Sequence, residues 1–198
     1  MSRPNDVLGK SDAELVRLSL QNQDNFLFIV QRYETKLLRY IRRISGVSAE
    51  DAEDVLQEVF IKVYLKLNDF DPDLKFSSWI YRITHNQVIS HYRWLKARPV
   101  GLALGENSQL IDSLISSLNL EADVELALLR ADIYKVLNRL DEKYREVIVL
   151  KYFEDKNYRE ISDILKKPMG TVGTLLNKAK DKFRAEFERH KDIHVQFL

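Results

Sequence analysis

The stretch DAEDVLQEVFIKVYLKLNDFDPDLKFSSWIYRITHNQVISHYR occupies residues 51–93 and contains two segments in which apolar residues recur at helical spacing. Pro72, flanked by Asp71 and Asp73, separates them, because proline lacks a backbone donor and aspartate competes for backbone groups. The pattern predicts helices over 49–68 and 76–96. Ser48 precedes the first, and its pairing with Asp51 resembles a capping box.

The same apolar periodicity extends through most of the chain in both directions. It predicts further helices over 11–20, 23–44, 122–139, 141–154, 158–166 and 171–188. The 198 residues include only six Gly and four Pro, so there is little material for the tight turns of a sandwich or barrel. No segment alternates with period two. The sequence therefore predicts an all-α protein.

Several classes of function are disfavoured by composition. The chain has no Cys, which excludes disulfide scaffolds and thiolate chemistry and fits a reducing compartment. No secretory leader or bilayer-spanning run is evident, so a cytoplasmic protein without membrane insertion is expected. His190 and His194 are spaced like metal ligands but lack an evident third ligand. We expect no enzyme activity, small-molecule substrate, metal or cofactor.

The net charge is only +1, but basic and acidic residues are grouped in separate segments of the chain. Residues 74–105 carry five bases and no acid, 99–129 carry five acids and no base, and 166–184 carry six bases and one acid. Two basic blocks suggest two nucleic-acid contacts. The Ser-rich, acidic stretch 99–120 reads as a flexible linker between a domain over 10–98 and a second over 121–190.

Helix 49–68 carries an unusual stripe. Its core face is formed by Val55, Leu56, Val59, Phe60, Val63 and Leu67. The opposite face holds Asp54, Gln57 and Glu58, with Ile61 and Leu65 among them. Large aliphatic side chains inside an acidic solvent-facing stripe suggest a protein interface, although isolated apolar residues are also common on ordinary surfaces.

Helix 76–96 carries a basic strip flanked by aromatic residues. The strip contains Arg82, Asn86 and Arg93, together with His85, Ile89 and Lys96. Guanidinium groups hold phosphates and amides read base edges, so the strip suits nucleic acid. Trp79 and Tyr81 either stack on unpaired bases or belong to the core, and the preceding loop 68–75 could cradle an extruded base.

A helix-turn-helix is predicted near the C-terminus. Helix 158–166 is followed by the turn KKPMG over 166–170 and by an amphipathic helix that buries Val172, Leu176, Ala179, Phe183 and Phe187. Its outer face is small and polar at first and basic afterwards, which is typical of a helix that enters the major groove. That face presents Thr171, Gly173, Thr174, Asn177, Lys178 and Asp181.

Residues 51–93 and 140–184, in this order and separation, resemble the sigma-70 family of bacterial RNA polymerase sigma factors, in its extracytoplasmic-function (ECF) group. The resemblance implies a sigma2-like helical bundle and a sigma4-like helix-turn-helix domain. It implies a transcription initiation factor that binds core RNA polymerase, recognises the −10 and −35 promoter elements and assists melting. The implied partners are the polymerase β′ clamp helices and β flap, promoter DNA and an anti-sigma factor.

The resemblance also implies roles for individual residues. Core polymerase binding falls on Asp54, Gln57, Glu58, Ile61 and Leu65. Recognition and melting of the −10 element fall on Asn68, Phe70, Lys75, Ser77, Trp79, Arg82, Asn86 and Arg93. Recognition of the −35 element falls on Thr171, Gly173, Thr174, Asn177 and Lys178.

This chain departs from the family pattern in three places. Ser90 stands where Asp is frequent, and Gly173 and Leu175 stand where many relatives carry bases. Fewer phosphate anchors predict weaker autonomous DNA affinity and a flatter salt dependence. The main alternative is a two-domain helix-turn-helix regulator that acts without polymerase, which leaves the Asp54/Gln57/Glu58 stripe unexplained. A helical scaffold protein without nucleic-acid affinity is a further alternative.

Overall fold

The N-terminal half of the chain forms four helices whose ends follow from local chemistry. Helix α1 (Asp12–Gln21) begins with a capping box between Ser11 and Glu14, and α2 (Phe26–Ser45) ends at Gly46, whose φ of 68° is left-handed. Ser48 caps α3 (Ala49–Leu65) through the backbone N–H of Asp51. Helix α4 (Phe76–Ala97) follows the proline-containing loop.

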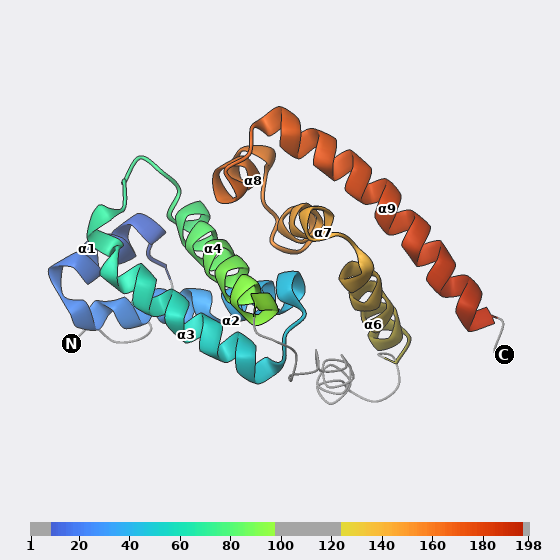
Figure 1. Ribbon diagram of the computed structural model, residues 1–198. Coiled ribbons are helices and arrows are strands. Elements are labelled where there is room, and N and C mark those ends of the chain that lie inside the picture. The colour runs from blue at the N-terminus through green and yellow to red at the C-terminus, as the bar shows by residue number, and fades with distance from the viewer. Residues whose placement is uncertain (1–8, 98–123, 196–198) are drawn as a thin grey trace.

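The C-terminal half forms a second group of helices. Helix α6 (Val124–Arg139) leads to α7 (Glu142–Ile148), which continues as one π-helical turn, Val149–Phe153. A capping box between Asn157 and Glu160 starts α8 (Tyr158–Leu165), and α9 (Met169–Val195) follows after a short turn. We call α1–α4 the N-terminal unit and α6–α9 the C-terminal unit (Figure 1).

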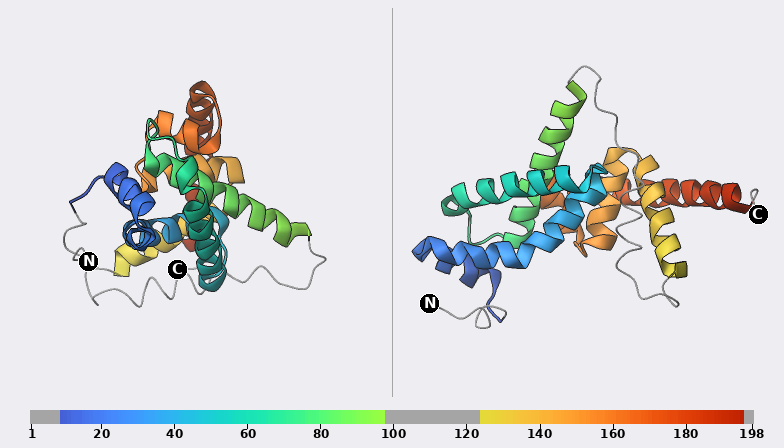
Figure 2. Two further views of the ribbon diagram at one scale, coloured as in Figure 1. Left: turned by 90° about the vertical axis from the view of Figure 1, so that its left-hand side faces the viewer. Right: turned by 90° about the horizontal axis from the view of Figure 1, so that it is seen from below.

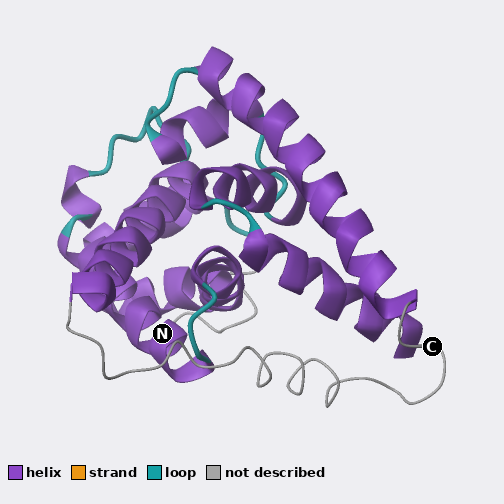
Figure 3. Ribbon diagram, turned by 45° about the vertical axis from the view of Figure 1, so that its right-hand side comes forward, coloured by secondary structure: helices purple, strands orange, loops and turns teal. Residues whose placement is uncertain are grey.

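This computed structural model describes residues 9–97 and 124–195, with side chains over 9–91 and 129–190. Within those ranges every regular element is a helix, which confirms the all-α prediction (Figure 3). The predicted linker 99–120 lies outside them. No helix in the described ranges is long and apolar enough to cross a membrane.

Helix α9 differs from the sequence expectation at both ends. It starts at Met169, so Met169 and Gly170 form its first turn and do not belong to the preceding turn as predicted. It continues to Val195, seven residues beyond the predicted end at 188. Pro168 stands directly before the first helical residue, where its missing N–H costs the helix nothing.

A single hydrophobic core runs through both units. In the N-terminal unit it is built on fully buried residues such as Ile29, Leu37 and Tyr40, and in the C-terminal unit on Leu150 and Ile161. Each buried aliphatic or aromatic side chain of this kind stabilises the fold by about 1.5–3 kcal/mol. The continuity of the core means that the two units rest on one another.

The units meet chiefly where α8 packs on α4, with additional contacts from α2 to α7 and the π-turn. Figures 1 and 2 show α8 beside the start of α4, while α9 runs away from the N-terminal unit towards the C-terminus. Helix α6 packs along the distal part of α9. The first helix of the predicted helix-turn-helix therefore serves as the bridge between the units.

Candidate nucleic-acid and protein interfaces

The acidic-aliphatic stripe of α3 lies on the surface of the N-terminal unit. The side chains of Ile61 and Leu65 are 60% and 69% exposed, the highest values among the exposed large apolar residues of the described chain. Asp54, Gln57 and Glu58 are also exposed. The opposite face, which includes Val55, Val59 and Val63, is buried as predicted. The stripe is thus held outward by a well-packed helix.

The stripe is connected to α4 through one glutamine, Gln87. The Gln87 amide donates a hydrogen bond to the Glu58 carboxylate and accepts one from the Lys62 ammonium group. Gln87 is buried, so its hydrogen bonds limit the orientations that Glu58 can adopt. This link could not be predicted from the sequence, because the two helices meet only in the tertiary structure.

A largely apolar cavity of about 540 Å³ opens between α1 and the loop before α4. Phe70, Pro72 and Leu74 contribute from the loop side, and Val16 and Leu20 from α1. Lys75 and Ser77, both predicted site residues, also line it, whereas Asn68 is exposed nearby on a 3-10 turn. The cavity has apolar walls and a cationic edge, the combination that suits an unstacked base next to its phosphate.

The predicted aromatic stacking platforms are buried. Phe70 and Trp79 are 9% and 8% exposed, and both rings pack against Phe76 at centroid distances of 5.2 and 5.5 Å. Tyr81 is also buried. Trp79 and Tyr81 therefore belong to the core, the second of the two alternatives that the sequence left open, and Phe70 packs against Trp79 while lining the cavity.

The basic strip of α4 is only partly formed. Asn86 is exposed and Arg82 is half-buried, while the side chain of Arg93 lies outside the described residues. His85 does not belong to the strip as predicted: it is buried, and its Nδ1 lies 3.2 Å from the hydroxyl of Tyr40. Ser90, at a departure from the family pattern, donates to the Asn86 carbonyl at 2.8 Å.

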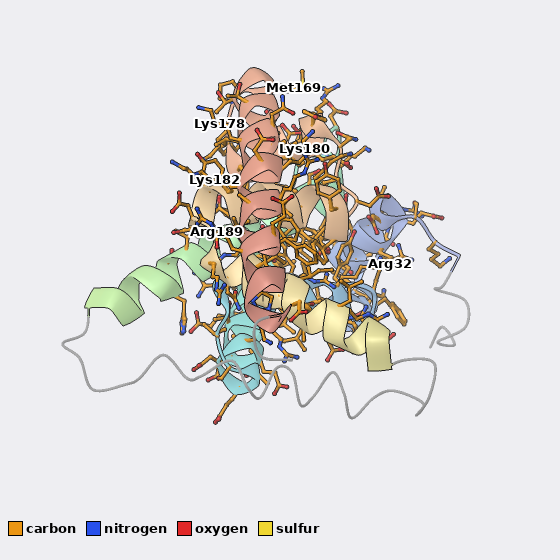
Figure 4. All side chains as sticks on the ribbon, turned by 90° about the vertical axis from the view of Figure 1, so that its right-hand side faces the viewer. Arg32, Met169, Lys178, Lys180, Lys182 and Arg189 are labelled. Carbon is orange, nitrogen blue, oxygen red and sulfur yellow. The ribbon has the colours of Figure 1, made fainter. Side chains whose placement is uncertain are left out.

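The predicted recognition face of α9 is exposed. Thr171, Thr174, Asn177 and Lys178 all point to solvent, and Gly173 lies under the ring of Tyr158, 3.6 Å from where a Cβ would stand. Figure 4 shows Lys178, Lys180 and Lys182 along the same helix. Leu175 is partly buried and packs against the core. A lysine or arginine at that position would have to extend its side chain past this packing to reach a phosphate.

A buried carboxylate joins the two units. Glu154, whose side chain is 5% exposed, accepts hydrogen bonds from Arg43 at 2.8 Å and from the Tyr81 hydroxyl at 2.6 Å. Burial, followed by the charge of Glu154, raises the pKa of Tyr81 far above its usual range. At the edge of the same contact, Lys75 pairs with Glu160 at 3.1 Å. A predicted DNA-contacting lysine is therefore occupied by the C-terminal unit in this arrangement.

A histidine-glutamate pair lies deeper in the same interface. His85 Nε2 is 3.5 Å from the Glu146 carboxylate, and both side chains are buried. Burial raises the pKa of Glu146 to about 7, with the nearby charge of Glu142 adding to the effect. Burial also lowers the pKa of His85 to about 4. His85 is therefore neutral at pH 7, whereas Glu146 is protonated only below about pH 7.

The raised pKa of Glu146 predicts a pH-dependent stability. Because the folded protein holds the Glu146 proton more tightly than the unfolded chain, this contribution is present below pH 4.5 and is lost as the pH rises to about 7. Glu146→Gln removes the titration. We expect the free energy of unfolding of the Glu146→Gln protein minus that of wild type to rise with pH, by on the order of 1 kcal/mol per pH unit across that interval.

Chemical denaturation of both proteins between pH 5 and 8 measures this difference. Comparison with wild type cancels most of the opposing titration of His85, whose contribution grows as the pH rises from about 4 to 6.5. Asp163→Asn, at an exposed carboxylate of α8, is the control and should track wild type at every pH. A Glu146→Gln curve parallel to wild type would contradict the prediction.

The C-terminal end of α9 has a structural role that the sequence left open. His190 is buried, and its Nε2 lies 2.9 Å from the Asp132 carboxylate of α6. This contact joins the distal part of α9 to α6. Among the described residues no group of three or more potential ligands could hold a metal ion. The structural role of His190 could not be predicted from the sequence, because its partner Asp132 is 58 positions away in the chain.

Comparison with known families agrees with this geometry. Residues 29–98 match the family described as Sigma-70 region 2, and residues 130–183 match Sigma-70, region 4. The first match covers most of α2 and all of α3 and α4, and the second covers most of α6, all of α7 and α8, and α9 as far as residue 183. The α3 stripe and the recognition helix therefore fall in different family regions.

Similar proteins span nearly the whole chain. The ECF RNA polymerase sigma factor SigW of Bacillus subtilis (strain 168) is 36% identical over 173 residues, covering 83% of this chain and 90% of the relative. The ECF RNA polymerase sigma-E factor of Escherichia coli (strain K12) is 30% identical over 169 residues, covering 83% and 87%.

Two solved structures share the fold. CnrH in complex with the cytosolic domain of CnrY has a TM-score of 0.67 at 25% identity, covering 91% of this chain and 99% of that chain. The sigma factor RpoE in complex with the anti-sigma factor NepR from Bartonella quintana has a TM-score of 0.60 at 18% identity, covering 83% and 97%. The chain thus belongs to the ECF group of the sigma-70 family, and it directs RNA polymerase to promoters at transcription initiation.

Proposed function

We propose that the chain performs this function through three separate surfaces on two domains. Core polymerase binds the α3 stripe of the domain over 10–98. The cavity and α4 strip of the same domain engage the −10 element, and the α9 face of the domain over 121–190 reads the −35 element. The acidic segment 99–120 joins the domains. The polymerase contacts are the β′ clamp helices for α3 and the β flap for the second domain.

The exposure of Ile61 and Leu65 is the observation that supports polymerase docking. An apolar centre with an acidic rim is the composition of a protein interface, and DNA would be repelled by Asp54 and Glu58. A helix-turn-helix regulator that acts alone has no use for such a stripe. Runoff transcription from a promoter library, with core enzyme and this protein, tests the proposal. Transcripts that do not depend on the added protein would overturn it.

For the −10 surface, we expect Arg82→Ala and Asn86→Ala to impair promoter opening more than initial duplex binding. Both side chains lie on α4 outside the core, Asn86 exposed and Arg82 half-buried, so we expect the substitutions to leave the fold intact. Loss of a base or phosphate contact costs about 1–3 kcal/mol, which is up to about a hundredfold in the open-complex equilibrium. Permanganate footprinting measures opening, and gel shift with duplex DNA measures initial binding. Equal losses in both assays would contradict a melting role.

For the −35 surface, Asn177→Ala and Lys178→Ala form an informative pair on neighbouring exposed positions of α9. Asn177→Ala should weaken binding to the preferred −35 sequence by about 1–3 kcal/mol and leave other sequences unchanged. Lys178→Ala should weaken binding to all sequences and reduce the salt slope by about one counterion. Fluorescence anisotropy across salt concentrations measures both effects. A sequence-independent loss for Asn177→Ala would refute base reading by that side chain.

An anti-sigma factor is the remaining proposed partner. Both solved relatives are complexes, one with the cytosolic domain of CnrY and the other with the anti-sigma factor NepR. A partner that covers the α3 stripe would compete with core polymerase. The chain itself contributes no chemistry to RNA synthesis, requires no cofactor, and acts in the cytoplasm, where core polymerase and promoter DNA are found.

A further inference from the structure

A second cavity, of about 430 Å³, lies between the two units and differs in character from the first. Helix α2 lines one side, Ser77 and Tyr81 of α4 line another, and residues 153–156 of the C-terminal unit close it. It includes none of the residues assigned to polymerase docking or to the −35 element. Of the residues assigned to the −10 element, only Ser77 is shared with it.

One face of α2 supplies a ladder of cations to this cavity. Arg32, Lys36, Arg39 and Arg43 recur at spacings of four, three and four residues, so they follow one another along the same side of the helix. The two ends of the ladder are already neutralised: Arg32 pairs with Asp12 at 2.9 Å, and Arg43 pairs with Glu154 at 2.8 Å. The two exposed central cations, Lys36 and Arg39, have no carboxylate within ion-pair distance among the described residues.

The C-terminal unit adds a third cation from the opposite wall. The Lys156 ammonium group lies over the Tyr81 ring, 4.3 Å from its centroid, and within the described chain it has no ion-paired carboxylate. Burial lowers the pKa of Lys156, and the charge of Lys36 lowers it further, while Glu160 and Glu154 act against both effects. Two lysines from different units therefore line one cavity, where their mutual repulsion is smaller than the attraction of Lys156 to Glu160 and Glu154.

An anion between them would convert this repulsion into two attractions. The partly buried Lys156 attracts a multivalent anion more strongly than the exposed Lys36 and Arg39 do, because the effective dielectric constant around it is lower. The Tyr33 ring on α2, and the Tyr81 ring and Ser77 on α4, provide aromatic and hydroxyl groups in two walls of the cavity, which Asp12, Glu154 and Asp155 also line. We propose that this cavity binds a small multivalent phosphate, such as an inorganic polyphosphate or the phosphate chain of a nucleotide, which bridges Lys36 and Arg39 to Lys156 and holds the two units together.

The arrangement of the units favours a small ligand over DNA. The cavity exists only while residues 153–156 lie against α2 and α4, and a strand of DNA threaded between the units would push them apart. A phosphate that stabilises this arrangement would keep Lys75 paired with Glu160 and α8 against α4. It would thereby oppose promoter engagement without touching the recognition helix.

Isothermal titration calorimetry of the full chain tests the site directly and does not depend on polymerase activity. The probes are inorganic triphosphate, ATP and a single-stranded DNA oligonucleotide, all without divalent metal. We expect one saturable site for triphosphate. Tighter binding of ATP would assign a nucleotide as the source, and equal binding would assign inorganic polyphosphate. Lys36→Gln and Lys156→Gln should each weaken triphosphate binding at least about tenfold, since each removes a charge-assisted contact.

Lys182→Gln, at an exposed lysine of α9 far from the cavity lining, is the matched control and should bind triphosphate like wild type. Because the chain has no cysteine, Glu53→Cys with Asp163→Cys introduces a single labelled pair, one on α3 and one on α8. Energy transfer between the labels should increase with triphosphate and remain unchanged in the Lys156→Gln background.

The proposal is overturned by absence of saturable triphosphate binding, or by equal weakening in Lys182→Gln. It is also overturned if only the DNA oligonucleotide binds, or if triphosphate binds with no increase in energy transfer. Failure of the transcription assay would leave these measurements unaffected, so the two proposals fail separately.

Discussion

Glu154→Ala is expected to separate the N-terminal and C-terminal units. The substitution removes the carboxylate that accepts from Arg43 and Tyr81, and it leaves a partly buried guanidinium group without its acid. Breaking a buried pair by removing one partner costs about 3–5 kcal/mol, because the remaining charge stays desolvated. The substitution therefore destabilises the contact between the units. We expect the units to separate before either of them unfolds.

Small-angle scattering should therefore report a larger radius of gyration for Glu154→Ala, with far-UV circular dichroism unchanged. Asp155→Asn is the matched control: the neighbouring residue is exposed, its φ of 49° is left-handed, and asparagine tolerates that conformation. It should scatter like wild type. An unchanged radius of gyration in Glu154→Ala would show that Glu154 does not hold the units together.

Ile61→Glu is expected to weaken core polymerase binding by about thirtyfold or more, the loss associated with an interface hot spot of about 2 kcal/mol. The Ile61 side chain is exposed, so a glutamate there does not disturb the core. It would place a charge in the apolar centre of the stripe, beside Glu58, where both desolvation and like-charge repulsion oppose docking.

Leu20→Glu is the control for that experiment, since Leu20 is an exposed leucine of α1 outside the stripe. Binding of labelled core enzyme in the absence of DNA separates docking from promoter recognition. Glu58→Lys should weaken binding in the same direction. Wild-type core affinity in Ile61→Glu, with an intact circular dichroism spectrum, would remove α3 from the polymerase interface.

Most of the helices could be predicted from the sequence, because a helix with one apolar face repeats that face every three to four residues. The two sides of α3 are the clearest case: Val55, Val59 and Val63 are buried, and Ile61 and Leu65 are exposed, as the helical wheel indicates. The recognition face of α9 was predictable for the same reason. The burial or exposure of these residues can be predicted without knowing where any other helix lies.

Predictions that required knowledge of neighbouring helices were less successful. His85 was placed in the nucleic-acid strip, but Tyr40 and Glu146 enclose it. The position of His85 at the edge of the polar face of its helix does not indicate whether another helix covers that residue. The role of the C-terminal end of α9 could not be predicted either, because His190 contacts Asp132 on a different helix.

The sequence by itself determined the helices, their buried faces and the two surface patterns that mark a sigma factor, because these depend on residues close together in the chain. Only the tertiary structure decided which polar groups share a buried site. The Arg43–Glu154 and His85–Glu146 pairs join residues 111 and 61 positions apart, respectively. Such pairs form only after the helices pack, and their energies depend on burial that no local pattern records.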